Sequence, residues 1–208
     1  NSSTNDVSKI TPGGVSTTNW AATGTGPVAI TVDSADNIYT ANYNTNNVTK
    51  ITPGGVSTTN WAATGLNPKG ISVDSAGNIY TANIGPSNVS KITPSGTSTI
   101  LGTTGTNPFA IATDSAGNIY TPNNSSNDVK KITPDGVSTT SWAATGTGTN
   151  PYAIAMDSAG NIYTANFNSN NVSKITPGGT STILGDTGTN PRGIAVDSAG
   201  NIYTANFS

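Results

Sequence analysis

Apolar and polar positions follow one pattern along this chain, and the pattern recurs five times. Short runs of Ile, Val, Tyr and Ala are bounded by Gly, Pro, Asn and Asp, and no stretch of useful length places apolar residues at helical spacing. The phrase DSAGNIYTAN at 157–166 recurs with small changes, and the phrase KITP at 174–177 accompanies each copy. The sequence therefore predicts an all-β protein made of near-copies of one supersecondary unit.

One complete unit spans residues 27–65 and predicts four strands. Its first strand is a short apolar run of the kind that is buried on both faces, and a tight turn leads to a second strand in which Ile38 and Tyr39 point to opposite faces. Both side chains can be buried only if each sheet is covered on both sides. The fourth strand is rich in Ser and Thr, which suits an outer edge in contact with water. We expect the four strands at Ala29–Val32, Asn37–Asn42, Val48–Thr52 and Val56–Asn60.

The repeat period of 40–43 residues is typical of a propeller blade, since solenoid repeats of that length are helical. The segment Asn1–Trp20 supplies third and fourth strands, and Pro191–Ser208 supplies first and second strands, so the two ends together make one blade. We therefore predict a single domain over 1–208, a five-bladed β-propeller of four-stranded antiparallel blades. Its ring is closed by N-terminal outer strands pairing with C-terminal inner strands. A fragment of a longer array is the alternative that stays open.

The phrase at Pro191–Asn206 is followed, in a complete repeat, by a second phrase such as the one at Asn170–Ile175. This pair of phrases resembles the NHL repeat and is similar to the repeats of streptogramin-lyase-like propellers. The similarity covers essentially the whole chain. It implies propeller blades, which serve binding, enzymatic and scaffolding roles. NHL propellers usually have six blades, so a count of five departs from that family. The resemblance to the lyases implies catalysis by His and acidic residues with a bound metal, and this chain has neither His nor Glu.

The low charge of the chain bears on its partners. Charged residues make up 9% of the sequence and the net charge is −2, so no basic field would attract a phosphate backbone, and we expect no nucleic-acid partner. No apolar run approaches the roughly 18 residues of a membrane span. Without Cys there is neither a disulfide framework nor thiol chemistry. The composition, rich in Ser, Thr and Asn, is typical of many secreted bacterial proteins, and we expect a monomer outside the cell or on its surface.

The residue types present give little support to catalysis. Nucleophilic triads need His or Cys, and glycosidases need two neighbouring carboxylates with different pKa values. We therefore expect no enzyme activity, no catalytic residue, no metal and no cofactor. A metal-dependent enzyme is the least favoured hypothesis.

Three residue sets recur by repetition, and each has a structural and a functional interpretation. The Asp residues either ring a channel and hold a cation such as Ca²⁺, or cap their own turns through side-chain hydrogen bonds, which we favour. The Lys residues either attract an anion or guard a strand edge, which we favour. The Trp residues either stack on sugars or pack on the outer rim, which we favour. The sets are Asp33, Asp74, Asp114, Asp157 and Asp197; Lys9, Lys50, Lys91, Lys131 and Lys174; and Trp20, Trp61 and Trp142.

The positions at which the copies differ are the best candidates for a binding site. One follows the Pro that opens each first strand, and the other follows the second strand, so both are expected on the same face. Aromatic faces with one or two donors suit a small polar ligand such as a sugar, or a protein partner. Drift at exposed loops and a structural, amplified or designed scaffold without a ligand are the alternatives. The candidate residues are Val28, Lys69, Phe109, Tyr152 and Arg192 at the first position, and Tyr43, Ile84, Asn124, Phe167 and Phe207 at the second.

Overall fold

The computed structural model describes residues 3–146 and 148–207, and every regular element within them is a β-strand. The chain forms two compact units, residues 1–100 and 101–208. In the residues that the structure describes, no helix has the length and apolar character needed to cross a membrane.

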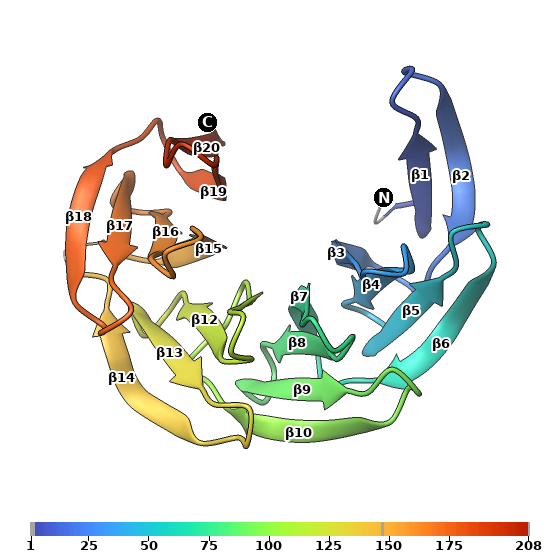
Figure 1. Cartoon of the computed structure of the whole chain (residues 1–208), viewed down its shortest axis with the longest axis horizontal. Coiled ribbons are helices and arrows are strands. Elements are labelled where there is room, and N and C mark those ends of the chain that lie inside the picture. Colours follow the sequence, from blue (N-terminus) through green and yellow to red (C-terminus); the bar gives the residue numbers. More distant parts are fainter. Residues whose placement is uncertain (1–2, 147, 208) are drawn as a thin grey trace. The chain divides into compact units, whose positions relative to one another are not determined.

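The first unit contains antiparallel meanders in which strands pair in chain order (Figure 1). A two-stranded sheet comes first, and two four-stranded sheets follow; the last strand of the second one crosses the boundary between the units. The strands are β1 (Asp6–Ile10) and β2 (Ser16–Ala22); β3 (Pro27–Val32), β4 (Ile38–Asn42), β5 (Asn47–Ile51) and β6 (Ser57–Ala63); and β7 (Pro68–Val73), β8 (Ile79–Asn83), β9 (Asn88–Ile92) and β10 (Ser98–Thr103).

The second unit repeats this arrangement with two four-stranded sheets and a final two-stranded one. The strands are β11 (Ala112–Thr113), β12 (Ile119–Asn123), β13 (Asp128–Ile132) and β14 (Ser138–Ala144); β15 (Pro151–Met156), β16 (Ile162–Asn166), β17 (Asn171–Ile175) and β18 (Ser181–Asp186); and β19 (Pro191–Val196) and β20 (Ile202–Asn206).

These sheets confirm the prediction of an all-β chain with four-stranded antiparallel blades. The fourth strand is longer than predicted, since β6 continues to Ala63 and places Trp61 and Ala62 against the core. Five blades and a closed ring stay predictions: among the described residues, β1–β2 and β19–β20 are separate two-stranded sheets.

The core of each unit lies between successive sheets. In the first unit, Tyr39 and Val48 of one sheet pack with Ile71, Ile79 and Ile92 of the next. In the second unit, an equivalent cluster joins the sheet of β12 to the sheet of β16. Ile79 is fully buried and its neighbour Tyr80 is nearly so, which confirms that such a sheet is covered on both faces.

One strand departs from the pattern, and the cause is a single residue. Pro122 stands in β12 where the other copies have Ala, and its ring nitrogen has no hydrogen to donate. The Pro122 carbonyl accepts from the Phe109 N–H at 3.3 Å. The Pro122 nitrogen, which has no hydrogen, is on the same side of the strand and therefore also faces residues 109–111. The ladder on that side keeps only the two residues of β11 and an isolated bridge between Pro108 and Asn123.

Candidate functional site

The two variable positions of each repeat lie on adjoining segments: one directly after the Pro at the start of the first strand, the other directly after the second strand. The residue before each opening Pro accepts a backbone hydrogen bond from the residue that follows the second strand, over 2.8–3.1 Å. In four repeats the accepting residue is an Asn in the left-handed region, and in the first it is Gly26. The donor and acceptor pairs are Tyr43 and Gly26, Ile84 and Asn67, Asn124 and Asn107, Phe167 and Asn150, and Phe207 and Asn190.

In the second unit these segments bring five of the ten predicted residues into one cluster. The ring centroids of Phe109 and Tyr152 are 5.0 Å apart and the two rings meet edge to face, while those of Tyr152 and Phe167 are 5.8 Å apart. The Arg192 guanidinium carbon is 4.1 Å from the centroid of the Phe207 ring, 5.2 Å from that of Phe167 and 5.6 Å from that of Tyr152. We call Phe109, Tyr152, Phe167, Arg192 and Phe207 the aromatic–arginine cluster.

The cluster contains residue types that occur nowhere else in the chain. The sequence has three Phe and one Arg, and all four belong to the cluster. Phe207 is 54% exposed and Arg192 is exposed, whereas Phe109, Tyr152 and Phe167 are half-buried. The aromatic faces are therefore held by the loops yet reachable from solvent.

Asparagine side chains fix the loops that carry the cluster. The Asn150 side-chain nitrogen Nδ2 donates to the Asn124 backbone carbonyl at 3.0 Å, and the Asn150 backbone N–H donates to Asn127 Oδ1 at 2.7 Å. Asn168 Nδ2 donates in turn to the Asn150 side chain. Sequence reasoning predicted Asn124 but missed Asn127, Asn150 and Asn168, although the recurring Asn-Pro dipeptide was an available signal for Asn150. The loops are thus preorganised, which a binding site requires.

The other five predicted residues are placed differently. In the first unit the Lys69 ammonium nitrogen is 5.6 Å from the centroid of the Tyr43 ring. As in the contact of Arg192 with Phe167, a cation lies over an aromatic ring. Val28 is exposed and Ile84 is half-buried. Asn124 contributes hydrogen bonds to Asn150 instead of a ring face.

The recurring aspartates are turn caps, as the favoured interpretation predicted. Asp74 Oδ1 accepts from the Ala76 and Asn78 N–H groups at 3.0 and 2.8 Å. Its other oxygen accepts from Asn78 Nδ2 at 2.8 Å and from the Tyr80 hydroxyl at 2.9 Å. Burial by itself would raise the pKa of Asp74, but these four bonds outweigh it and hold the pKa below its ordinary value. Every carboxylate of the set is engaged in this way.

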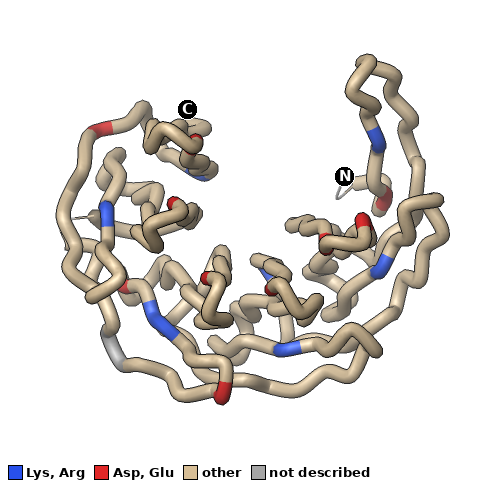
Figure 2. The backbone as a smooth tube through the Cα atoms, viewed as in Figure 1, with Lys and Arg blue, Asp and Glu red and all other residues tan. Residues whose placement is uncertain are grey.

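The interpretation of the recurring lysines as guards of a strand edge is wrong for the four-stranded sheets. They lie on third strands, and in the four-stranded sheets the third strand pairs on both sides and is no edge (Figure 2). Lys50 lies opposite Tyr39, with its ammonium nitrogen 5.7 Å from the Tyr39 ring centroid and 5.5 Å from that of Trp61. The charge is stabilised by aromatic faces at the outer side of the blade.

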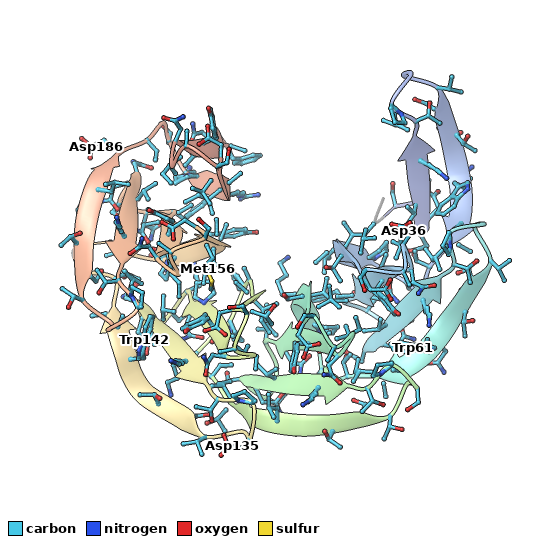
Figure 3. All side chains as sticks on the ribbon, in the orientation of Figure 1. Asp36, Trp61, Asp135, Trp142, Met156 and Asp186 are labelled. Carbon is cyan, nitrogen blue, oxygen red and sulfur yellow. The ribbon has the colours of Figure 1, made fainter. Side chains whose placement is uncertain are left out.

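The tryptophans pack between sheets, which confirms the favoured interpretation. The Trp61 ring centroid on β6 is 5.2 Å from that of Tyr39, and the Trp142 centroid on β14 is 5.1 Å from that of Tyr120 (Figure 3). Trp20 lies against the Gly55 turn of the following sheet, where a Cβ would come within 3.1 Å of the indole. These rings serve the framework.

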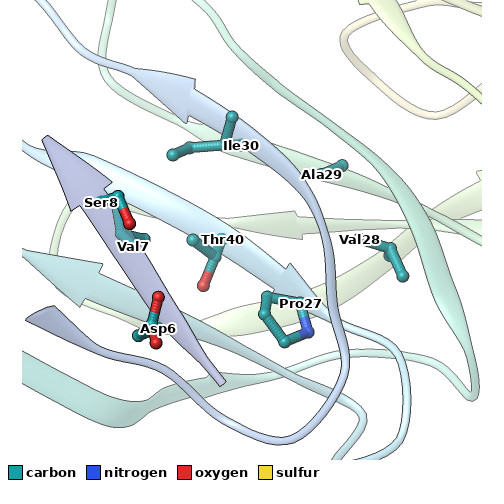
Figure 4. A pocket seen from close by; sticks show the side chains of 8 residues that line it. All are labelled: Asp6, Val7, Ser8, Pro27, Val28, Ala29, Ile30 and Thr40. Atoms are coloured by element: carbon teal, nitrogen blue, oxygen red, sulfur yellow. The ribbon is translucent and has the colours of Figure 1, made fainter. Parts of the chain in front are cut away.

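Two clefts are lined by residues that do not belong to the cluster. One of about 300 Å³ in the first unit is lined by β1, β3 and Thr40 of β4 (Figure 4). Another of about 570 Å³ in the second unit lies between the turns of Asp114 and Asp157. Among the described residues, no group of three or more His, Cys, Asp or Glu is placed to hold a metal ion.

The family of the chain follows from its sequence over its whole length. The model of the virginiamycin B lyase family matches residues 1–208. This chain belongs to the virginiamycin B lyase family. No curated protein matches it.

Several solved structures share the β-propeller fold of this family member. A catalytically inactive His-to-Ala variant of virginiamycin B lyase from Staphylococcus aureus, solved with quinupristin, has a TM-score of 0.81 and 18% identity, with 99% of this chain and 72% of that chain covered. A streptogramin B lyase has a TM-score of 0.79 and 16% identity, with coverage of 100% and 78%. A chain of a nidogen–laminin complex has a TM-score of 0.74 and 18% identity, with coverage of 87% and 72%.

The expectation that the chain is not an enzyme is wrong. Its family and three of its structural neighbours are lyases. That expectation rested on the absence of His and Cys for a nucleophilic triad and of paired carboxylates, but Asp, Lys and Tyr can also transfer protons, and electrostatic stabilisation by Arg needs none of these. The S. aureus lyase is inactive when one His is replaced, and this chain contains no His.

Proposed function

We propose that this member of the virginiamycin B lyase family binds a small ring-containing ligand on the aromatic–arginine cluster. One observation carries the proposal: all three Phe and the single Arg of the chain gather with Tyr152 on one accessible surface. Aromatic faces stack on flat rings and on the apolar faces of sugars, and they lose little conformational entropy on binding.

The fold itself does not require these aromatic residues. At the first variable position another repeat has Val28, and at the second position other repeats have Ile84 and Asn124, with the same backbone hydrogen bond between the loops. A loop that closes equally well with Val, Ile or Asn needs no Phe or Tyr for its geometry. The aromatic side chains therefore serve the surface that they form.

Quinupristin is the first ligand to test, because a structural neighbour of the same family was solved with it. Calorimetric titration of the whole chain should give saturable binding of quinupristin, and a panel of neutral sugars tests the smaller polar ligands. Mass spectrometry of quinupristin after incubation tells whether the chain also cleaves it.

Residues exchanged between repeats make suitable variants. Tyr152→Val and Phe167→Ile each install a residue that another repeat carries at the same position. Each should weaken binding by about 1–2 kcal/mol, the size of one aromatic contact with the area that it buries. Trp20→Leu is the control, since other repeats have Leu in the corresponding strand. Absence of saturable binding by all these compounds, or equal loss in the control, would favour a scaffold without a ligand at this surface.

We also propose that the chain completes a fifth blade by pairing β20 with β1. Both strands expose residues that are buried at the same repeat position elsewhere. Ile10 on β1 is 69% exposed while Ile51 is fully buried, and Tyr203 on β20 is 58% exposed while Tyr80 is 1% exposed. Exposure of such framework residues is costly, and mutual pairing of the two strands would bury them.

The clefts next to these strands support the same pairing. The cleft beside β1 is lined by Val28 and Ile30, which stay exposed, whereas Ile71 at the position of Ile30 is buried. In the second unit a cleft of about 130 Å³ is lined by β17, β18 and β20. Four-stranded sheets elsewhere pair the second and third strands as Thr40 with Thr49, which predicts Thr204 opposite Ser8.

A further inference from the structure

The aromatic–arginine cluster places a guanidinium next to three aromatic rings. Arg192 follows Pro191, which is buried and pairs with Asn206 of β20. Its guanidinium carbon lies closest to the Phe207 ring, at 4.1 Å from the centroid, with Phe167 and Tyr152 beyond it. Stacking of this kind fixes the plane of the guanidinium and leaves its N–H donors at the edge of the plane.

No carboxylate in the described part of the chain neutralises this guanidinium. Arg192 forms no ion pair with a described residue, and the recurring aspartates are engaged by their own turns. Asp128, the acidic residue of β13, accepts from Asn123 and Ser126. The side chain is exposed, so its donors face solvent.

The framework has no need of an arginine at this position. Other repeats place Val28, Phe109 or Tyr152 after the same Pro, and Lys69 is the only other cation there. Lys69 also lies over the aromatic residue that follows the second strand of the preceding repeat, as Arg192 lies over Phe167. Placement of a cation on an aromatic face therefore recurs, but only Arg192 presents a planar set of donors.

From this geometry we infer that Arg192 binds an oxyanion of the ligand, such as a carboxylate, while the rings of Tyr152 and Phe167 stack on the ring that carries it. This inference rests on the proposed function of the cluster. A guanidinium can donate two parallel hydrogen bonds to one carboxylate, and prior stacking on Phe207 lowers the entropy lost on binding. Arg192 is then the residue that selects a charged ligand over a neutral one of the same shape.

Matched pairs of compounds separate charge from shape. Benzoate and benzamide share an aromatic ring, and glucuronate and glucose share a sugar ring; each pair differs in one anionic group. Because the chain has one Arg, its nitrogen–proton correlation spectrum has a single arginine Nε–Hε signal, which reports the site without assignment of the backbone. We expect the anionic member of at least one pair to bind about tenfold to hundredfold more tightly and to shift this signal.

Three variants complete the test. Arg192→Gln should abolish the preference for the anion, Arg192→Lys should retain part of it, and Lys9→Gln, which removes one charge in the first unit, should retain all of it. Equal affinity within both pairs, an unmoved Arg192 signal at saturation, or an unchanged preference in Arg192→Gln would overturn the inference. If quinupristin binds and none of the four small compounds does, the inference fails while the proposed function stands; if nothing binds, both fail.

Discussion

Removal of one hydroxyl group from a buried tyrosine tests how the recurring turns stabilise the sheets. Tyr80 is 1% exposed, and its hydroxyl donates one of the four hydrogen bonds that Asp74 accepts, at 2.9 Å. Tyr80→Phe removes this bond and leaves the ring in place. A hydrogen bond to a charged group contributes about 1.5–3 kcal/mol, so the free energy of unfolding should fall by about that amount.

Urea unfolding followed by circular dichroism measures the change, with an unaltered m-value as evidence that the denatured state is the same. Tyr43→Phe is the matched control, because the Tyr43 hydroxyl has no hydrogen bond in the described structure, and it should cost less than about 0.5 kcal/mol. If Tyr80→Phe also costs less than that, the claim that the tyrosine hydroxyl stabilises the turn through Asp74 is refuted.

Three further predictions concern pH, close packing and ring closure. Burial and the hydrogen bond to Asp raise the pKa of the buried second-strand tyrosines above the ordinary 10.0, so the free energy of unfolding should be intact below pH 10 and fall above it. The turn aspartates have lowered pKa values, so the free energy of unfolding should also fall below about pH 3.8. Urea titrations across pH check both limits. Gly65→Ala should cost about 1–3 kcal/mol in the same assay because its Cβ would meet the buried Asn83 side chain at 2.8 Å. Gly13→Ala, with its nearest atom at 3.9 Å, should cost little, and equal costs would contradict this. Cysteines introduced at Ser8 and Thr204 should form a disulfide within one chain, as seen on non-reducing electrophoresis. Cysteines introduced at Ser8 and Tyr203, one residue out of register, should not form it. Cross-linked dimers alone would exclude closure within the chain.

Much of the fold could be predicted because local rules set it. Residues such as Gly77 stand in the left-handed region at the expected turn position, and Ile and Tyr alternate to opposite faces in every second strand. The two-residue β11 could not be predicted with the same ease, because the effect of Pro122 depends on which neighbour its missing N–H faces. The lysine positions were misjudged for a related reason: the third strand lies inside a four-stranded sheet.

The candidate site was predictable only in part. Repetition identified the ten variable positions, but which side chains touch depends on their lengths and on how one blade stacks on the next. Arg192 reaches three rings from two repeats. Absence of His and Glu was a poor guide to activity, since family membership rests on the whole chain and not on two residue types.

The central claim is that the aromatic–arginine cluster binds the ligand, and fluorine NMR tests it most directly. All three Phe of the chain belong to the cluster, so incorporation of fluorophenylalanine gives signals from the cluster alone; fluorotryptophan at Trp20, Trp61 and Trp142 reports the framework. On titration with quinupristin, we predict that the phenylalanine signals shift with one common saturation curve while the tryptophan signals stay in place. Saturable binding that moves the tryptophan signals and leaves every phenylalanine signal unchanged would contradict the account.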